Sequence, residues 1–125
     1  MRYKISPSDD KTFLVQKMWG EITSKEALKC AEECHSTGKG LGINCFLVDA
    51  TEARNIDNIL GNYDFAYREL DSAQIDKRAR VALLISPGDP SHDFIETVCR
   101  NAGHDVTIFT NRELAEKHLK SEPEK

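Results

Sequence analysis

Three predicted strands, two of them almost wholly apolar, constrain the fold of this chain more than any other feature. They are INCFLV (43–48), RVALLIS (80–86) and DVTIFT (105–110), and stretches with helical periodicity separate and follow them. A short apolar run without alternation is typical of a strand that is covered on both faces. Because helices connect these strands, right-handed crossovers would place the strands in parallel. The sequence therefore predicts an α/β domain.

The N-terminal segment adds an antiparallel element to this prediction. RYKIS (2–6) alternates in character and runs into the turn cluster PSDD (7–10). TFLVQKMW (12–19) then has the β-branched and aromatic bias of a strand. We expect the two segments to form a hairpin. The predicted fold is a single domain with a mixed sheet of about five strands and four helices, in the order ββαβαβαβα.

The expected helices are marked by caps and by apolar stripes. A capping box formed by Thr23 and Glu26 opens the first helix, and Gly38 and Gly40 are expected to end it. The signals of the other three helices are an apolar stripe from 56 to 70, an Asp89-Pro90 start, and a second capping box of Thr110 and Glu113.

Composition narrows the class of protein. The 125 residues, 39% of them hydrophobic and 30% charged, suit one globular domain, with the fold over 1–120 and a polar tail at 121–125. A net charge of −4 gives no reason to expect binding to nucleic acid or to an anionic membrane. No segment reads as a signal peptide or is apolar for long enough to insert into a membrane, so we expect a cytoplasmic protein.

Candidate site residues follow from the parallel sheet. Ligands of open α/β sheets bind outside the carboxyl ends of the strands, where loops and helix starts converge. We therefore expect a site on the loops that follow the three inner strands. These loops carry Asp49, Thr51, Arg54, Ser86, Asp89 and His92.

The sequence gives little support to a catalytic role for these residues. A phosphoryl-accepting receiver domain would need a helix after Asp9-Asp10, where a strand is predicted, and a lysine where Thr110 stands. A hydrolytic triad of Ser86, His92 and Asp49 lacks the G-x-S-x-G turn that exposes a nucleophile. We expect the Asp9-Asp10 pair to form a hairpin turn and the protein to have no catalytic residues.

The sequence also gives little support to phosphate or metal binding by two other motifs. SPGDPSH (86–92) lacks the glycine spacing and the lysine of a phosphate loop. Cys30, Cys34 and His35 share a helix, but a structural zinc site would show a second pair of ligands. Buried, inert cysteines are the expectation, with Cys30 the thiol to test for reactivity. We expect no metal and no cofactor.

The predicted second helix carries candidate residues for a protein interface. Tyr63 and Tyr67 are neighbours one turn apart on the predicted second helix, and Ile56 lies at its start. The polar ends of the two tyrosine rings need partners. These three residues are therefore candidates for a protein interface.

The ordered motifs resemble those of SpoIIAA-like proteins, small bacterial domains with the STAS fold of anti-sigma-factor antagonists. The resemblance rests on WGEIT, LVDATEAR, RVALLIS and NAGHDVTIFTNRELAEKHL, and it covers about residues 1–120. It implies a regulatory or interaction module without enzymatic activity. In STAS regulators, an Asp-Ser-Ser-Gly motif carries a serine whose phosphorylation switches partner binding.

This chain departs from that motif. In NIDNILGNYD, Asp57 matches the aspartate, but Asn58 and Ile59 stand where the serines should be. The departure removes the phosphoacceptor, and Thr51 is the nearby hydroxyl that remains. We expect Thr51 to shape the backbone rather than to accept phosphate.

Two hypotheses follow. The first is a non-catalytic module that binds a protein or a second copy of itself through the loop 49–58 and the start of the next helix, with Asp49 and Arg54 paired. The second is a small-molecule-binding or weakly enzymatic domain that uses the crevice at the strand ends. The residues of the predicted binding loop and crevice are Asp49, Thr51, Arg54, Asp57, Asn58, Ser86 and His92.

Overall fold

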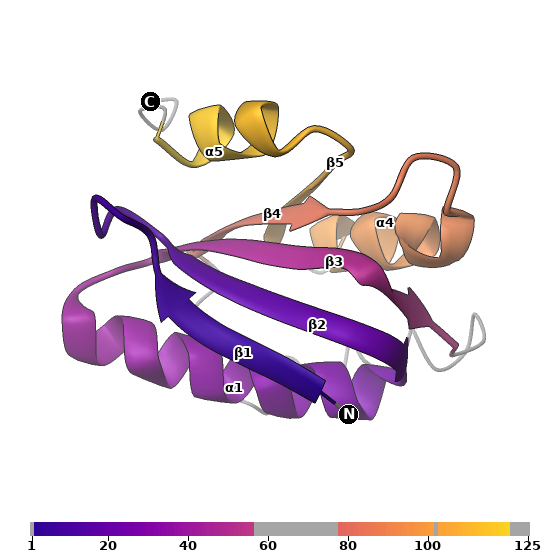
Figure 1. Ribbon diagram of the computed structural model, residues 1–125, viewed down its shortest axis with the longest axis horizontal. Coiled ribbons are helices and arrows are strands. Elements are labelled where there is room, and N and C mark those ends of the chain that lie inside the picture. The colour runs from indigo at the N-terminus through magenta and orange to yellow at the C-terminus, as the bar shows by residue number, and fades with distance from the viewer. Residues whose placement is uncertain (1, 57–77, 102, 121–125) are drawn as a thin grey trace.

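Figure 1 shows the computed structural model, which describes residues 2–56, 78–101 and 103–120. The helix predicted from 56 to 70 lies outside the described residues, apart from Ile56 itself. The described elements are β1 (Arg2–Pro7), β2 (Leu14–Ile22), α1 (Ser24–Leu41), β3 (Cys45–Asn55), β4 (Arg80–Leu84), a 3-10 turn at Pro90–His92, α4 (Asp93–Asn101), β5 (Asp105–Phe109) and α5 (Arg112–Lys120).

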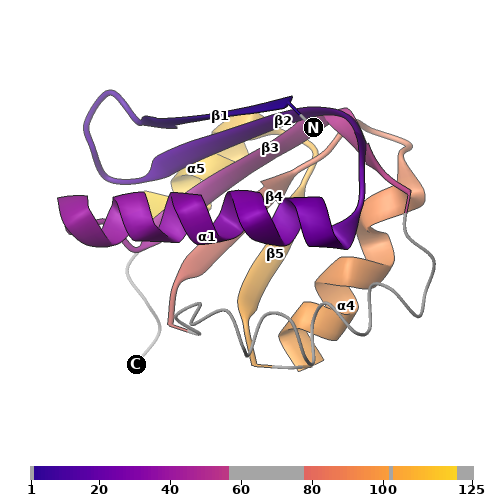
Figure 2. The same ribbon diagram turned by 90° about the horizontal axis from the view of Figure 1, so that it is seen from below.

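The five strands form one mixed sheet in the order β1-β2-β3-β4-β5. β1 pairs with β2 antiparallel, and the other neighbours are parallel. This confirms the predicted fold class. From β2 onward the sheet grows in one direction, so right-handed crossovers place α1 and α4 on the same face. α5 lies on the opposite face from α1, as Figure 1 shows, while Figure 2 views the sheet from the α1 side.

Both faces of the sheet are packed with apolar side chains. α1 covers one face, and α5 covers β3 and β4 on the other. The buried residues beneath α1 include Leu14, Met18, Phe46, Ala50 and Leu83, which pack with Cys30 and Cys34 of the helix. Those beneath α5 include Phe13, Leu47, Ala82 and Leu84, which pack with Ala115 and Leu119.

α1 begins as predicted and ends later. The Thr23 hydroxyl accepts from the Glu26 N–H, and the Glu26 side chain accepts from the Thr23 N–H, so the capping box is complete. The predicted end at Gly38 and Gly40 is wrong, because the helix continues to Leu41 and stops at Gly42, whose φ of 73° is left-handed. Gly38 has a packing role instead: a Cβ there would lie 2.6 Å from the Ile43 carbonyl oxygen and 3.0 Å from the Phe46 ring.

The largest difference from the sequence prediction is the length of β3. The segment 49–55 was predicted as a loop, but it is the second half of the strand. It continues to pair with β2 as far as Asn55, opposite Ile22, so β2 also runs three residues beyond the predicted end at 19. β2 and β3 thus extend past the carboxyl end of β4, and the predicted loop is wrong.

A bulge accompanies this extension. Lys17 pairs with Asp49 and Trp19 pairs with Glu52, so β3 has one residue more than β2 over this stretch. An extra residue shifts the alternation of side chains between the two faces of a strand. Ala50 and Ala53, three positions apart, are consequently both buried beneath α1. The polar residues of the segment are thereby held in a strand.

The predicted caps of the last two helices are shifted. Pro90 begins a 3-10 turn, and the α-helix itself starts at Asp93. The N-cap of α5 is Asn111 rather than Thr110, since the Asn111 side-chain oxygen accepts from the Leu114 N–H at 3.1 Å. No helix in the described ranges is long and apolar enough to cross a membrane.

Candidate functional site

The Ser86 hydroxyl and the His92 imidazole, both predicted to line the crevice, contact backbone carbonyl groups of β3 instead. Ser86 Oγ donates to the Thr51 carbonyl oxygen at 2.6 Å. His92 is 3% exposed, and its Nε2 lies 3.3 Å from the Ala53 carbonyl oxygen. Both side chains therefore brace the extended half of β3 from the end of β4 and the 3-10 turn. The structure thus brings Ser86 and His92 together along β3, where both stabilise the strand.

Asp49 and Thr51 form a local unit at the bulge. The Asp49 side chain is 8% exposed, and one carboxylate oxygen accepts from the Thr51 N–H at 3.1 Å and from the Thr51 hydroxyl at 2.7 Å. Arg112 Nη1 of α5 lies 4.0 Å from the other carboxylate oxygen. Arg54 is exposed further along β3. The expected Asp49–Arg54 pairing is wrong, and the cation that approaches Asp49 comes from α5.

Of the other residues predicted for the binding loop and interface, one is exposed and the rest lie outside the described part of the chain. Ile56 is 49% exposed, and its N–H donates to the Ile22 carbonyl oxygen at 2.9 Å. Glu52 and Arg54 are exposed before it, so the end of β3 presents a polar surface that closes with an apolar residue. The remaining predicted residues, Asp57, Asn58, Tyr63 and Tyr67, lie outside the described residues.

Three of the four cysteines are buried thiols, and Cys45 is partly buried. Cys30 and Cys34, on the inner face of α1, are both 0% exposed, and Cys99 is 4% exposed. Burial raises the pKa of the Cys30 thiol to about 12, with the neighbouring Cys34 adding to the shift. Among the described residues, no three His, Cys, Asp or Glu side chains gather as metal ligands.

A groove of about 480 Å³ lies between the β1–β2 hairpin and α5, and sequence reasoning missed it. We call it the hairpin–α5 groove. Alternate residues of the two strands face it, because side chains of one parity point to one face of a sheet. The hairpin contributes Lys4, Ser6, Val15 and Lys17, together with the turn 7–10 and Phe13.

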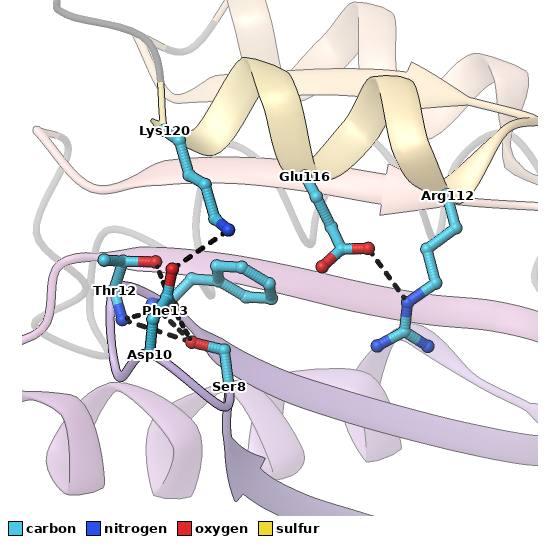
Figure 3. A network of polar contacts seen from close by, with 7 residues as sticks. All are labelled: Ser8, Asp10, Thr12, Phe13, Arg112, Glu116 and Lys120. Carbon is cyan, nitrogen blue, oxygen red and sulfur yellow. Dashed lines mark hydrogen bonds and ion pairs between the residues drawn. The ribbon is translucent and has the colours of Figure 1, made fainter.

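The opposite wall of the groove is one stripe of α5. Arg112, Glu116 and Lys120 are four residues apart and share a helix face. Figure 3 shows all three side chains extending from α5 toward the hairpin. This i, i+4, i+8 series, like the alternation on the hairpin, is visible in the sequence. It was missed because each residue was weighed as part of a single element.

Ion pairs hold the far end of the groove. Lys120 Nζ lies 2.9 Å from Asp10, whose carboxylate also accepts from the Thr12 N–H and hydroxyl and from the Ser8 hydroxyl (Figure 3). The Thr12 hydrogen bonds, and then Lys120, lower the pKa of Asp10 well below its ordinary value. The turn is thus an ordered support for the groove, which confirms the turn predicted for Asp9-Asp10.

The near end of the groove has two cations, one closely and one more loosely paired. Lys17 Nζ lies 2.9 Å from Glu52, which raises the pKa of Lys17, while the nearby Arg112 guanidinium acts in the opposite direction. Arg112 lies 3.5 Å from Glu116 and is 51% exposed. Two cations and their acidic partners therefore lie close together where β2, β3 and α5 meet.

A hairpin followed by parallel strands, with helices on both faces, defines a class of small α/β domain. Solved structures with this architecture match nearly the whole chain. One is an uncharacterized DUF3478-family protein with a SpoIIAA-like fold from Shewanella loihica PV-4, at a TM-score of 0.61 and 19% identity, covering 94% of this chain and 92% of that one.

Two further structures match the chain. The anti-sigma factor antagonist SpoIIAA in its unphosphorylated form has a TM-score of 0.53 and 16% identity, covering 96% of this chain and 100% of that one. The Bacillus cell fate determinant SpoIIAA in the phosphorylated form has a TM-score of 0.50 and 14% identity, covering 94% and 99%. No protein-family model and no curated protein matches the sequence. The chain therefore has the SpoIIAA-like, or STAS-like, fold that its motifs predicted.

Proposed function

We propose that this protein is a non-catalytic regulatory module that acts by binding another protein or a second copy of itself. The interaction surface begins at the exposed end of β3, with Arg54 and Ile56, and continues into the start of the following segment. The observation that carries the proposal is that the reactive groups beside this surface are engaged with the backbone, while the strand end itself faces solvent.

The engagement of Ser86 and His92 argues against catalysis at this edge. A nucleophilic serine needs its hydroxyl within reach of a base and open to substrate. Ser86 instead donates its proton to the Thr51 carbonyl, and His92 is buried against the Ala53 carbonyl. Both groups thus make contacts within the fold, which supports a non-catalytic role for this edge.

The exposed end of β3 is suited to recognition. Arg54 is an exposed guanidinium with five donors, and arginine is enriched at protein interfaces. Ile56 adds an exposed apolar side chain two residues away. The fold adds support, since one solved structure that shares it is an anti-sigma factor antagonist, a protein named for its action on another regulatory protein.

Regulation by serine phosphorylation is not part of this proposal. The segment that matches the Asp-Ser-Ser-Gly motif has Asn58 and Ile59 at the serine positions. Thr51, the hydroxyl nearby, donates to Asp49 at 2.7 Å within the bulge. Partner binding in this protein would therefore be controlled by other means, such as partner concentration or ligand binding.

Affinity capture from lysate of the native cell, with quantitative mass spectrometry, tests the proposal. Wild type is compared with Arg54→Ala and with Arg100→Ala, a matched control on an exposed arginine of α4. If the partner is another protein, wild type and Arg100→Ala should capture it equally, and Arg54→Ala should lose it. If the partner is a second copy, wild type and Arg100→Ala should be dimers and Arg54→Ala a monomer. Identical capture profiles and identical oligomeric states for all three proteins would reject the proposed surface.

A further inference from the structure

On the α5 side, no helix in the described part of the chain packs squarely on the β1–β2 hairpin. α5 packs on β3 and β4, so the corresponding face of β1 and β2 forms the floor of the hairpin–α5 groove. That floor is polar: Lys4, Ser6 and Lys17 face the groove together with Val15. A floor of this composition does not suit an apolar helix, and the occupant must be one that lysines can recognise.

Two lysines face each other across the floor. Lys4 and Lys17 are register partners in the antiparallel pair, on the same face of the sheet. Side chains in such pairs have Cβ atoms about 5 Å apart, and like charges there destabilise the sheet. Within the described part of the chain, no acidic side chain lies within 4 Å of the Lys4 ammonium. Among the described residues, the Lys4 charge on the hairpin is therefore not neutralised by an ion pair.

A third cation reaches the same end from α5. Arg112 lines the groove and is only loosely held, at 3.5 Å from Glu116 and 4.0 Å from Asp49. Arginine presents a planar fork that matches phosphate and carboxylate oxygens. With Lys4 and Lys17 below and Arg112 beside them, three cations from three different elements converge on one end of the groove.

We propose that the hairpin–α5 groove binds a small molecule that carries a phosphate or carboxylate group, with the oxyanion held by Lys4, Lys17 and Arg112. The volume of about 480 Å³ lies in the range of small-ligand sites. The rest of the molecule would lie toward Val15, Phe13 and the ordered turn. This site and the surface at Arg54 and Ile56 are built from different residues, with Glu52, the partner of Lys17, lying between them on β3.

The acids around the cations determine which anion binds. Glu52 and Glu116 already pair with Lys17 and Arg112, so a ligand must compete with them for these two cations. A monovalent anion gains too little in this exchange, because exposed ion pairs are weak and screened by salt. A multivalent oxyanion contacts all three cations at once, and we expect the groove to prefer it over chloride.

Amide chemical shifts measured by NMR during titration with inorganic pyrophosphate, and separately with citrate, at constant ionic strength test this proposal. We expect saturable shifts at Lys4, Lys17 and Arg112 for at least one of the two probes; the responsive probe identifies a phosphate or a carboxylate ligand. Lys4→Ala should raise the Kd about tenfold, as expected for the loss of one charge-assisted hydrogen bond.

Two further variants complete the design. Lys29→Ala removes an exposed lysine of α1, on the other face, and should bind like wild type. Arg112→Lys keeps the charge but removes the fork, and should also weaken binding. Non-saturating shifts for both probes, or an unchanged Kd in a folded Lys4→Ala or Lys4→Gln, would overturn the proposal. So would saturable binding of an acidic peptide alone, which would make the groove a protein contact.

Discussion

Gly38 and Gly40 lie two residues apart in α1, and only Gly40 has room for a side chain. A Cβ on Gly38 would lie 2.6 Å from the Ile43 carbonyl oxygen and 3.0 Å from the Phe46 ring, while a Cβ on Gly40 would meet nothing within 4 Å. The oxygen belongs to the backbone and the ring is 2% exposed, so neither can move without shifting the link between α1 and β3. The two Gly→Ala substitutions should therefore have opposite effects on stability.

The magnitudes follow from two competing contributions. Alanine stabilises a helix interior by about 1 kcal/mol relative to glycine, and both variants gain up to that amount. Overpacking costs about 1–3 kcal/mol, and only Gly38→Ala suffers it. Taking about 2 kcal/mol for the overpacking, Gly38→Ala should lose about 1 kcal/mol and Gly40→Ala should gain up to about 1 kcal/mol.

Urea denaturation of wild type and the two variants, followed by far-UV circular dichroism, measures these changes. With an m-value of about 2 kcal/mol per molar urea, a difference of about 2 kcal/mol separates the two midpoints by about 1 M. Wild type should fall between them. If Gly38→Ala proves as stable as Gly40→Ala, the close contact between α1 and the start of β3 does not exist, and the reasoning is refuted.

Three further predictions concern single groups. In the native protein at pH 7.5, the Cys30 thiol should react with iodoacetamide far more slowly than in urea, because its pKa is raised to about 12; equal rates would contradict its burial. Asp10 has a depressed pKa in the folded state, so its contribution to stability is present above the unfolded pKa of about 4 and is lost as the pH falls below it. Asp10→Asn should therefore flatten the acid limb of the stability–pH curve, whereas a curve that coincides with the wild-type curve would show that the Thr12 hydrogen bonds and the Lys120 pair of the Asp10 carboxylate contribute nothing. Incubation with a serine kinase and ATP should leave 49–60 unmodified, and stoichiometric phosphate on Thr51 by mass spectrometry would contradict this.

The order of strands and helices could be predicted from local chemistry. Fully apolar runs identify strands that are covered on both faces, and the Thr23–Glu26 capping box locates the start of α1 directly. The parallel direction of the inner strands then follows from their helical connections, which needs no knowledge of side-chain contacts. These signals depend on a few neighbouring residues, and that is why they remain reliable in a single sequence.

The extension of β3 could not be predicted in the same way. Asp49, Thr51 and Arg54 read as a loop because they are polar, and the bulge shifts Ala53 out of regular alternation with Ala50. The extra length is stabilised by tertiary contacts, from pairing with β2 and from Ser86. Such contacts join residues more than 30 positions apart, and no local pattern encodes them.

The candidate site was predicted in part for a related reason. The rule for α/β sheets directed attention to the carboxyl ends of the strands, but it did not show that Ser86 and His92 are engaged with the backbone of β3. The hairpin–α5 groove was not predicted, although its Arg112 end lies beside Asp49. Its cations come from β1, β2 and α5, and only the packed fold brings them together.

The central claim is that the exposed end of β3 is a recognition surface rather than a catalytic edge. Its most direct test is the Kd between this protein and the purified captured partner, or the dimer Kd, measured for wild type, Arg54→Ala and Arg100→Ala. We predict that Arg54→Ala binds about tenfold more weakly, a loss of about 1.4 kcal/mol, while Arg100→Ala stays within about twofold of wild type. Equal affinities for all three proteins would contradict the account.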